Sequence, residues 1–82
     1  MKLLAGFELK TIDGTQIITG NGVSLPVSET SALLFGELQK GEKTKEQLMH
    51  LLLDNFDIST VLALNNIDMF VKTLSQNGII EE

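Results

Sequence analysis

The sequence predicts an α+β fold in which a small three-stranded antiparallel sheet is followed by three helices. Up to Leu25 the apolar residues alternate in short runs, a period-two pattern that is typical of strands. From Ser28 onward they recur every three or four residues, which is the period of helices packed on one face. Eighty-two residues leave room for one modest core, so we expect a single domain spanning residues 1–82.

The first half of the chain contains two turn signals that divide it into strands. Asp13-Gly14 favours a tight hairpin because both residues tolerate a positive φ, and Gly20-Asn21-Gly22 marks a second turn. The segment between these turns is rich in β-branched residues. The strands are therefore predicted near Phe7–Ile12, Thr15–Thr19 and Gly22–Leu25.

Apolar alternation and a proline set the faces and limits of this sheet. We expect Phe7, Leu9 and Ile12 to share the face turned toward the core. Pro26 has no amide hydrogen and cannot extend a central strand, so we expect the third strand to end there and to lie at an edge of the sheet. Strands this short are marginal in water, so the sheet must pack on the helices.

The second half contains three helix-start signals. Ser28 is a good N-cap, Thr44 and Gln47 form a capping box, and Ser59 is expected to cap the third helix. Gly41 follows the first helical pattern, at a position where helices commonly end. The helices are predicted near Glu29–Lys40, Lys45–Asn55 and Thr60–Asn77.

The apolar stripes of these helices predict the core. Ile79 and Ile80 follow the third helix and are expected to fold back onto the same core. The stripe of the third helix consists of Leu64, Ile67, Val71 and Leu74, at spacings of three and four. Across the helices, the side chains expected to be largely buried are Leu34, Leu38, Leu48, Leu52, Ile67, Val71 and Leu74.

Composition narrows the classes of function. The chain has six lysines, no arginine and eleven acidic residues, for a formal net charge of −5. Duplex binding usually rests on several Lys or Arg contacts to phosphates, and Arg is the preferred reader of guanine, so nucleic acid is not expected as a partner. The sequence has no cysteine, no signal-peptide pattern and no apolar run long enough to span a membrane, so we expect a cytoplasmic protein without a membrane partner.

No residue pattern indicates catalysis or a bound cofactor. His50 has no second His or Cys to complete a metal site and is interpreted as a surface or half-buried residue. Asp54 and Asp57 are interpreted as helix-end residues rather than a catalytic pair, and the serines lack the partners of a triad. We therefore expect a protein that is not an enzyme and that holds neither a metal ion nor another cofactor.

The order of elements and caps resembles the PqqD-like family, small proteins also called RiPP recognition elements. Ser28-Glu29-Thr30 stands where members of that family often have Asn-Glu-Thr. Thr44-Lys45-Glu46-Gln47-Leu48 is similar to the opening of their second helix, and the run from Phe70 to Ile80 has their terminal Phe-Val-x-x-Leu-x-x-x-Gly-Ile-Ile pattern. The resemblance covers nearly the whole chain and implies a winged-helix-like arrangement of the sheet and the helices.

This resemblance implies that the protein binds a ribosomally made precursor peptide and presents it to a peptide-modifying enzyme, such as a radical-SAM protein. In such proteins the leader segment of the precursor adds as a strand beside the third strand and against the third helix. An edge strand suits this role because its unpaired N–H and C=O groups bond an extended peptide. The residues implied for the site are Val23, Ser24 and Leu25 on the strand, with Asn66, Met69, Phe70 and Thr73 on the third helix.

Several alternatives stay open at the level of sequence. Phe70 is equally well interpreted as a core residue, and for Met69 core filling is favoured over a place on a binding surface. A winged-helix DNA-binding regulator has the same helices, although Lys72 is the only basic residue between Ile58 and Gly78. A structural or interaction subunit of unrelated origin is a third interpretation.

Overall fold

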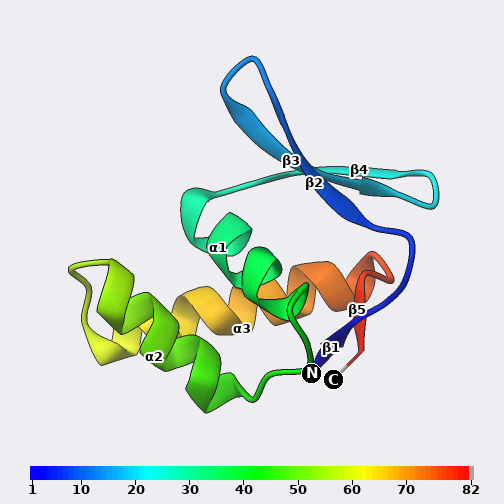
Figure 1. The fold of residues 1–82 in the computed structure, drawn as a ribbon. Helices are drawn as coiled ribbons and strands as arrows, with labels where there is room; N and C mark the ends of the chain where they lie inside the picture. Colours follow the sequence, from blue (N-terminus) through cyan, green and yellow to red (C-terminus); the bar gives the residue numbers. More distant parts are fainter. Residues whose placement is uncertain (82) are drawn as a thin grey trace.

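A computed structural model describes residues 1–81 of the chain, which form five strands and three helices (Figure 1). The elements are β1 (Lys2–Leu3), β2 (Glu8–Ile12), β3 (Thr15–Gly20), β4 (Val23–Val27), α1 (Glu29–Leu38), α2 (Lys45–Asn55), α3 (Thr60–Gln76) and β5 (Ile80–Glu81). β2, β3 and β4 form one antiparallel sheet in that order, and β1 pairs antiparallel with β5. The predicted α+β class is confirmed, whereas the short β1–β5 pair was not predicted.

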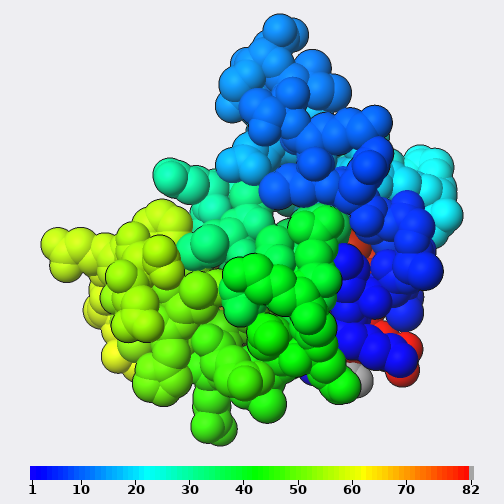
Figure 2. Space-filling model, in the orientation of Figure 1, coloured from blue at the N-terminus to red at the C-terminus, as the bar shows by residue number. Residues whose placement is uncertain are grey.

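Two tight turns build the three-stranded sheet. Asp13 and Gly14 both have positive φ, 51° and 79°, and join β2 to β3. Asn21 and Gly22, with φ of 46° and 82°, join β3 to β4 in the same way. Positive φ at both central residues is the geometry of the turn that matches the twist of a hairpin. Both predicted turns are therefore confirmed, and the tip of the β2–β3 hairpin projects away from the helices (Figures 1 and 2).

The third strand of this sheet is longer than expected. β4 continues through Pro26, which pairs with Ile17, and ends at Val27. The prediction that Pro26 ends the strand is therefore wrong. β4 pairs with β3 alone among the strands of residues 1–81, and a proline fits an edge strand when its nitrogen faces away from the neighbouring strand.

The three predicted N-caps are confirmed. The side-chain oxygens of Ser28, Thr44 and Ser59 each accept a hydrogen bond from the backbone N–H three residues further on, at 3.2, 3.1 and 3.1 Å. Gln47 completes the capping box, since its side chain accepts from the Thr44 backbone N–H at 2.8 Å. α2 has the predicted bounds, while α1 ends at Leu38 and α3 ends slightly earlier than expected.

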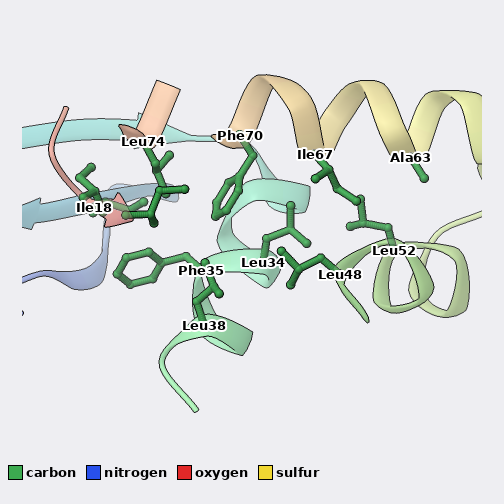
Figure 3. Packing of buried hydrophobic residues seen from close by; sticks show 12 residues of the cluster. Ile18, Leu34, Phe35, Leu38, Leu48, Leu52, Ala63, Ile67, Phe70 and Leu74 are labelled. Carbon is green, nitrogen blue, oxygen red and sulfur yellow. The ribbon is translucent and has the colours of Figure 1, made fainter. Parts of the chain in front are cut away.

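The core lies where α1, α2 and α3 meet the inner face of the sheet (Figure 3). Ile18 reaches it from the middle strand, and Ile79 and Ile80 return to it after α3, as expected. The predicted buried residues of the helices are confirmed, with the exception of Val71, which is half-buried. The central cluster consists of Ile18, Leu34, Phe35, Leu38, Leu48, Leu52, Ala63, Ile67, Phe70, Leu74, Ile79 and Ile80.

Two assignments of buried faces are wrong. On α3 the buried stripe is Ala63, Ile67, Phe70 and Leu74, so it runs one position to the side of the predicted Leu64 and Val71. Ala63 and Phe70 are buried, whereas Leu64 and Val71 are only partly covered. Ile12 is 51% exposed, because it lies three residues after Leu9 in a regular ladder and so points to the opposite face of the sheet, whereas Phe7 and Leu9 pack on the core.

A close approach between two backbone segments fixes the sheet on the body of the protein. Gly20 has a φ of +151°, and a Cβ at this position would clash with the carbonyl oxygen of Gly6. The side chain of Asn21 also donates a hydrogen bond to the carbonyl of Ala5 at 3.2 Å. The segment between β1 and β2 is therefore held against the end of β3.

Truncating Leu52 or Leu74 to alanine should lower the free energy of unfolding by about 2–5 kcal/mol, because each change leaves a cavity in the core. Urea unfolding followed by circular dichroism measures the loss. Val61→Ala is the control, since Val61 is 69% exposed and a change within about 0.5 kcal/mol is expected. Losses of that small size for both leucines would contradict the assignment of the core.

Two glycine-to-alanine changes should have opposite effects on stability. Gly20→Ala should lower the free energy of unfolding by about 1–3 kcal/mol, because of its positive φ and the clash with Gly6. Gly36→Ala should raise it by about 0.5–1 kcal/mol, since Gly36 lies within α1 and a Cβ there meets no atom within 4 Å. Thermal and urea unfolding measure both changes, and a stable Gly20→Ala variant would rule out the close approach.

Candidate functional site

The outer edge of β4 is the first part of the candidate site. Among residues 1–81, β4 pairs with β3 and with no other strand, so one row of its backbone groups has no strand partner. Val23, Leu25 and Val27 are half-buried and pack against the core, while Ser24 and Pro26 are exposed on the opposite face. The sheet order therefore places Val23, Ser24 and Leu25 on an edge strand, as predicted.

The turn between β3 and β4 sets the direction of the backbone groups on β4. Gly20 and Val23 flank the two-residue turn and are paired, which is the position where the first ladder bond of a hairpin forms. Because successive residues of a strand point their backbone groups to opposite sides, Leu25 also faces β3. Ser24 and Pro26 then face the open edge, and the missing N–H of Pro26 costs the sheet no bond.

A cavity of about 340 Å³ lies beside the end of this strand, between β4, the start of α1 and α3. β4 contributes Pro26 and Val27, and the capping region of α1 contributes Ser28 and Ser31. α3 contributes the opposite wall. The lining residues are Pro26, Val27, Ser28, Ser31, Asn66, Met69, Phe70, Thr73 and Leu74.

The structure brings the predicted helix residues of the site together. Asn66, Met69, Phe70 and Thr73 lie on neighbouring turns of α3 and all line the cavity. Met69 is 70% exposed, so the interpretation of Met69 as core filling is wrong. Phe70 is 2% exposed and its ring points into the core (Figure 3), which makes it the floor of the cavity rather than an exposed contact.

The strand residues of the predicted site lie along the open edge of β4 rather than in the cavity. Val23, Ser24 and Leu25 do not line the cavity but precede Pro26 on the same edge, so the edge leads into the cavity. The sequence interpretation missed Pro26, Val27, Ser28 and Ser31 because it ended the strand at Pro26. The signal that would have found them is the absence of any linker, since Ser28 alone separates β4 from α1.

The chemistry of the cavity is neutral. Its lining combines apolar side chains with the hydroxyls of Ser28, Ser31 and Thr73 and the amide of Asn66. Among the described residues, no charged side chain belongs to this lining. An uncharged lining suits apolar or neutral polar groups, because an ion would lose hydration there without gaining a counter-charge.

A second, larger cavity lies on another part of α3. It has a volume of about 630 Å³ and is lined by Lys45, Asp68, Lys72 and four neighbouring residues. Lys45 and Asp68 form an ion pair at 2.6 Å, but both side chains are at least half exposed, so water screens the pair. This cavity includes no residue of β4, so it has no edge at which a strand can add.

His50 and the acidic residues lie on several different elements of the chain. Within residues 1–81, no three His, Cys, Asp or Glu side chains gather closely enough to hold a metal ion. His50 is exposed on α2, as interpreted from the sequence. No helix in that part of the chain is long and apolar enough to cross a membrane.

Three helices with a projecting β-hairpin form a winged-helix-like arrangement, as expected, and two solved structures share it. The structure of TbiB1 in complex with the TbiA(beta) leader peptide superimposes with a TM-score of 0.81 at 14% identity, covering 99% of this chain and 95% of that one. Lasso peptide synthetase B1 complexed with the leader peptide gives a TM-score of 0.77 at 18% identity, covering 99% and 96%. These similarities establish the fold.

Comparison at the level of sequence gives no match. No protein-family model matches the chain, and no curated protein matches it.

The amide of Ser24 should exchange with deuterium much faster than the amide of Leu25, because only Leu25 faces β3. Native-state exchange followed by NMR measures both. For the same reason Ser24→Pro should leave the free energy of unfolding nearly unchanged, while Leu25→Pro should lower it by about 1–3 kcal/mol by leaving a ladder carbonyl without its donor. Equal protection of the two amides would show that the strand faces the other way.

Proposed function

We propose that this protein is a RiPP recognition element of the PqqD-like kind, which captures the leader of a ribosomally made precursor peptide by strand addition at β4. The observation that carries the proposal is the meeting of an open strand edge with a neutral cavity against α3. The likeness of the fold to two proteins solved with leader peptides supports it. The whole of residues 1–82 acts as one peptide-binding domain, located in the cytoplasm.

Strand addition divides recognition into two parts. The backbone groups of Ser24 on the open edge form ladder hydrogen bonds with an extended peptide, and these bonds do not depend on peptide sequence. The cavity beside Met69 and Thr73 receives peptide side chains and supplies selectivity. Phe70 acts by holding the cavity floor in place through its contacts in the core.

The role is non-catalytic presentation of the bound peptide to a separate modifying enzyme, such as a radical-SAM protein. The support is that the candidate site offers backbone groups, hydroxyls and apolar surface, which bind a peptide without activating a bond. His50, on α2, is not among the residues that line this cavity. A protein of this kind needs no metal or other cofactor of its own.

The winged-helix DNA-binding alternative is less well supported. A recognition helix needs basic side chains to contact phosphates and guanine, and α3 has Lys72 as its only basic residue. A net charge of −5 also repels the phosphate backbone. The part of α3 that lines the cavity carries Asn66, Met69 and Thr73, which suit a peptide better than a duplex.

Amide shift mapping with synthetic leaders of the short peptides encoded near this gene tests the proposal. The cognate leader should shift the amides of β4 and of α3 from Asn66 to Thr73. Met69→Glu should weaken leader binding by at least about tenfold, since it places a charge at the neutral cavity. Isothermal titration calorimetry measures the affinity.

Val61→Glu is the matched control, because Val61 is an exposed apolar residue of the same helix, 69% exposed against 70% for Met69, and does not line the cavity. It should leave leader affinity unchanged. Shifts confined to α2, or tight binding to duplex DNA at physiological salt, would reject the proposal.

A further inference from the structure

Pro26 stands at the point where the strand edge meets the cavity. We propose that Pro26 removes one donor from the main-chain ladder available to a bound peptide, so that binding depends more on side-chain contacts where the peptide enters the cavity. Pro26 thereby sets the affinity that a peptide must reach through its side chains in order to be captured. The inference rests on the proposed function, since it concerns how the same edge selects its peptide.

The backbone groups that face the open edge are unequal. At Ser24 both the N–H and the C=O point outward, so a peptide strand gains a donor and an acceptor. At Pro26 the C=O points outward but there is no N–H. A peptide carbonyl opposite Pro26 therefore finds no donor on β4, and the ladder has one bond fewer at this position.

The cavity begins at Pro26, the position where the ladder lacks its donor. Pro26 and Val27 are its first lining residues, and Met69 and Thr73 of α3 form the wall across from them. Within the described part of the chain, no charged group lines the space to compensate a charged peptide side chain. The peptide position that enters the cavity is therefore an apolar or neutral polar residue, and Asp, Glu, Lys and Arg are disfavoured there.

Removing one ladder bond lowers the affinity of every peptide, so that only peptides with good side-chain contacts bind tightly enough to be captured. A main-chain bond raises the affinity of every extended peptide by about the same factor, whatever its sequence. With one bond fewer, peptides that fill the cavity badly stay too weak to be captured at working concentration. A residue other than proline at position 26 restores the donor and lets such peptides bind.

The test uses a displayed library of random twelve-residue peptides, selected on the wild-type protein. One enriched peptide, and the same peptide with Asp at its conserved apolar position, are then titrated against the variants. Pro26→Val and Pro26→Ala should tighten both peptides by the same factor, about twofold to tenfold for one hydrogen bond. Val61→Ala is the control, because Val61 is exposed and does not line the cavity, and it should leave the affinity of both peptides unchanged.

Unfolding measurements on the Pro26 variants should show the cooperative transition of the wild type, lowered only by the greater entropy of the unfolded chain, since the nitrogen of Pro26 bonds no other strand of the sheet. Unchanged affinity in both variants, or a gain for one peptide and not for its Asp form, would overturn the inference while the proposed function stands. A wild-type protein that enriches no peptide sequence would overturn the proposed function, and the inference with it.

Discussion

The packing of α3 against α1, α2 and the inner face of the sheet is the constraint on which the candidate site depends. Ile67, Phe70 and Leu74 are buried along one line of α3, so the rotation of the helix about its axis is set by the core. With that line buried, Asn66, Met69 and Thr73 are turned to the cavity beside β4. The shape of the candidate site is thus fixed by buried side chains, of which Phe70 and Leu74 also line the cavity.

The helices were predictable because their signals are local. The caps at Ser28, Thr44 and Ser59 act within one helical turn, and the hydrogen bonds that they accept are the ones expected. The β1–β5 pair was not predictable, since two-residue strands at Lys2–Leu3 and Ile80–Glu81 have no periodic pattern and depend on the fold to bring them together. The line of burial on α3 was misplaced by one position, because a stripe of large aliphatic residues outweighed the small Ala63, which is fully buried.

The candidate site was predictable in part. The helix side came from the family resemblance, and the cavity brings Asn66, Met69, Phe70 and Thr73 together as that resemblance implied. The strand side was cut short at Pro26, because a proline ends a central strand but not an edge strand, and edge position is a property of the sheet rather than of the residues. The exposure of Met69 was missed for a related reason: a methionine is apolar in any setting, and only the neighbouring elements decide whether it is covered.

The single residue between β4 and α1 gives the open edge a fixed origin. Ser28 caps α1 directly after Val27, so β4 cannot slide along its own axis without unwinding the first turn of the helix. A one-residue slip would also exchange the inward and outward side chains of the strand. The position of each residue along the open edge is therefore fixed relative to the Ser28 cap of α1.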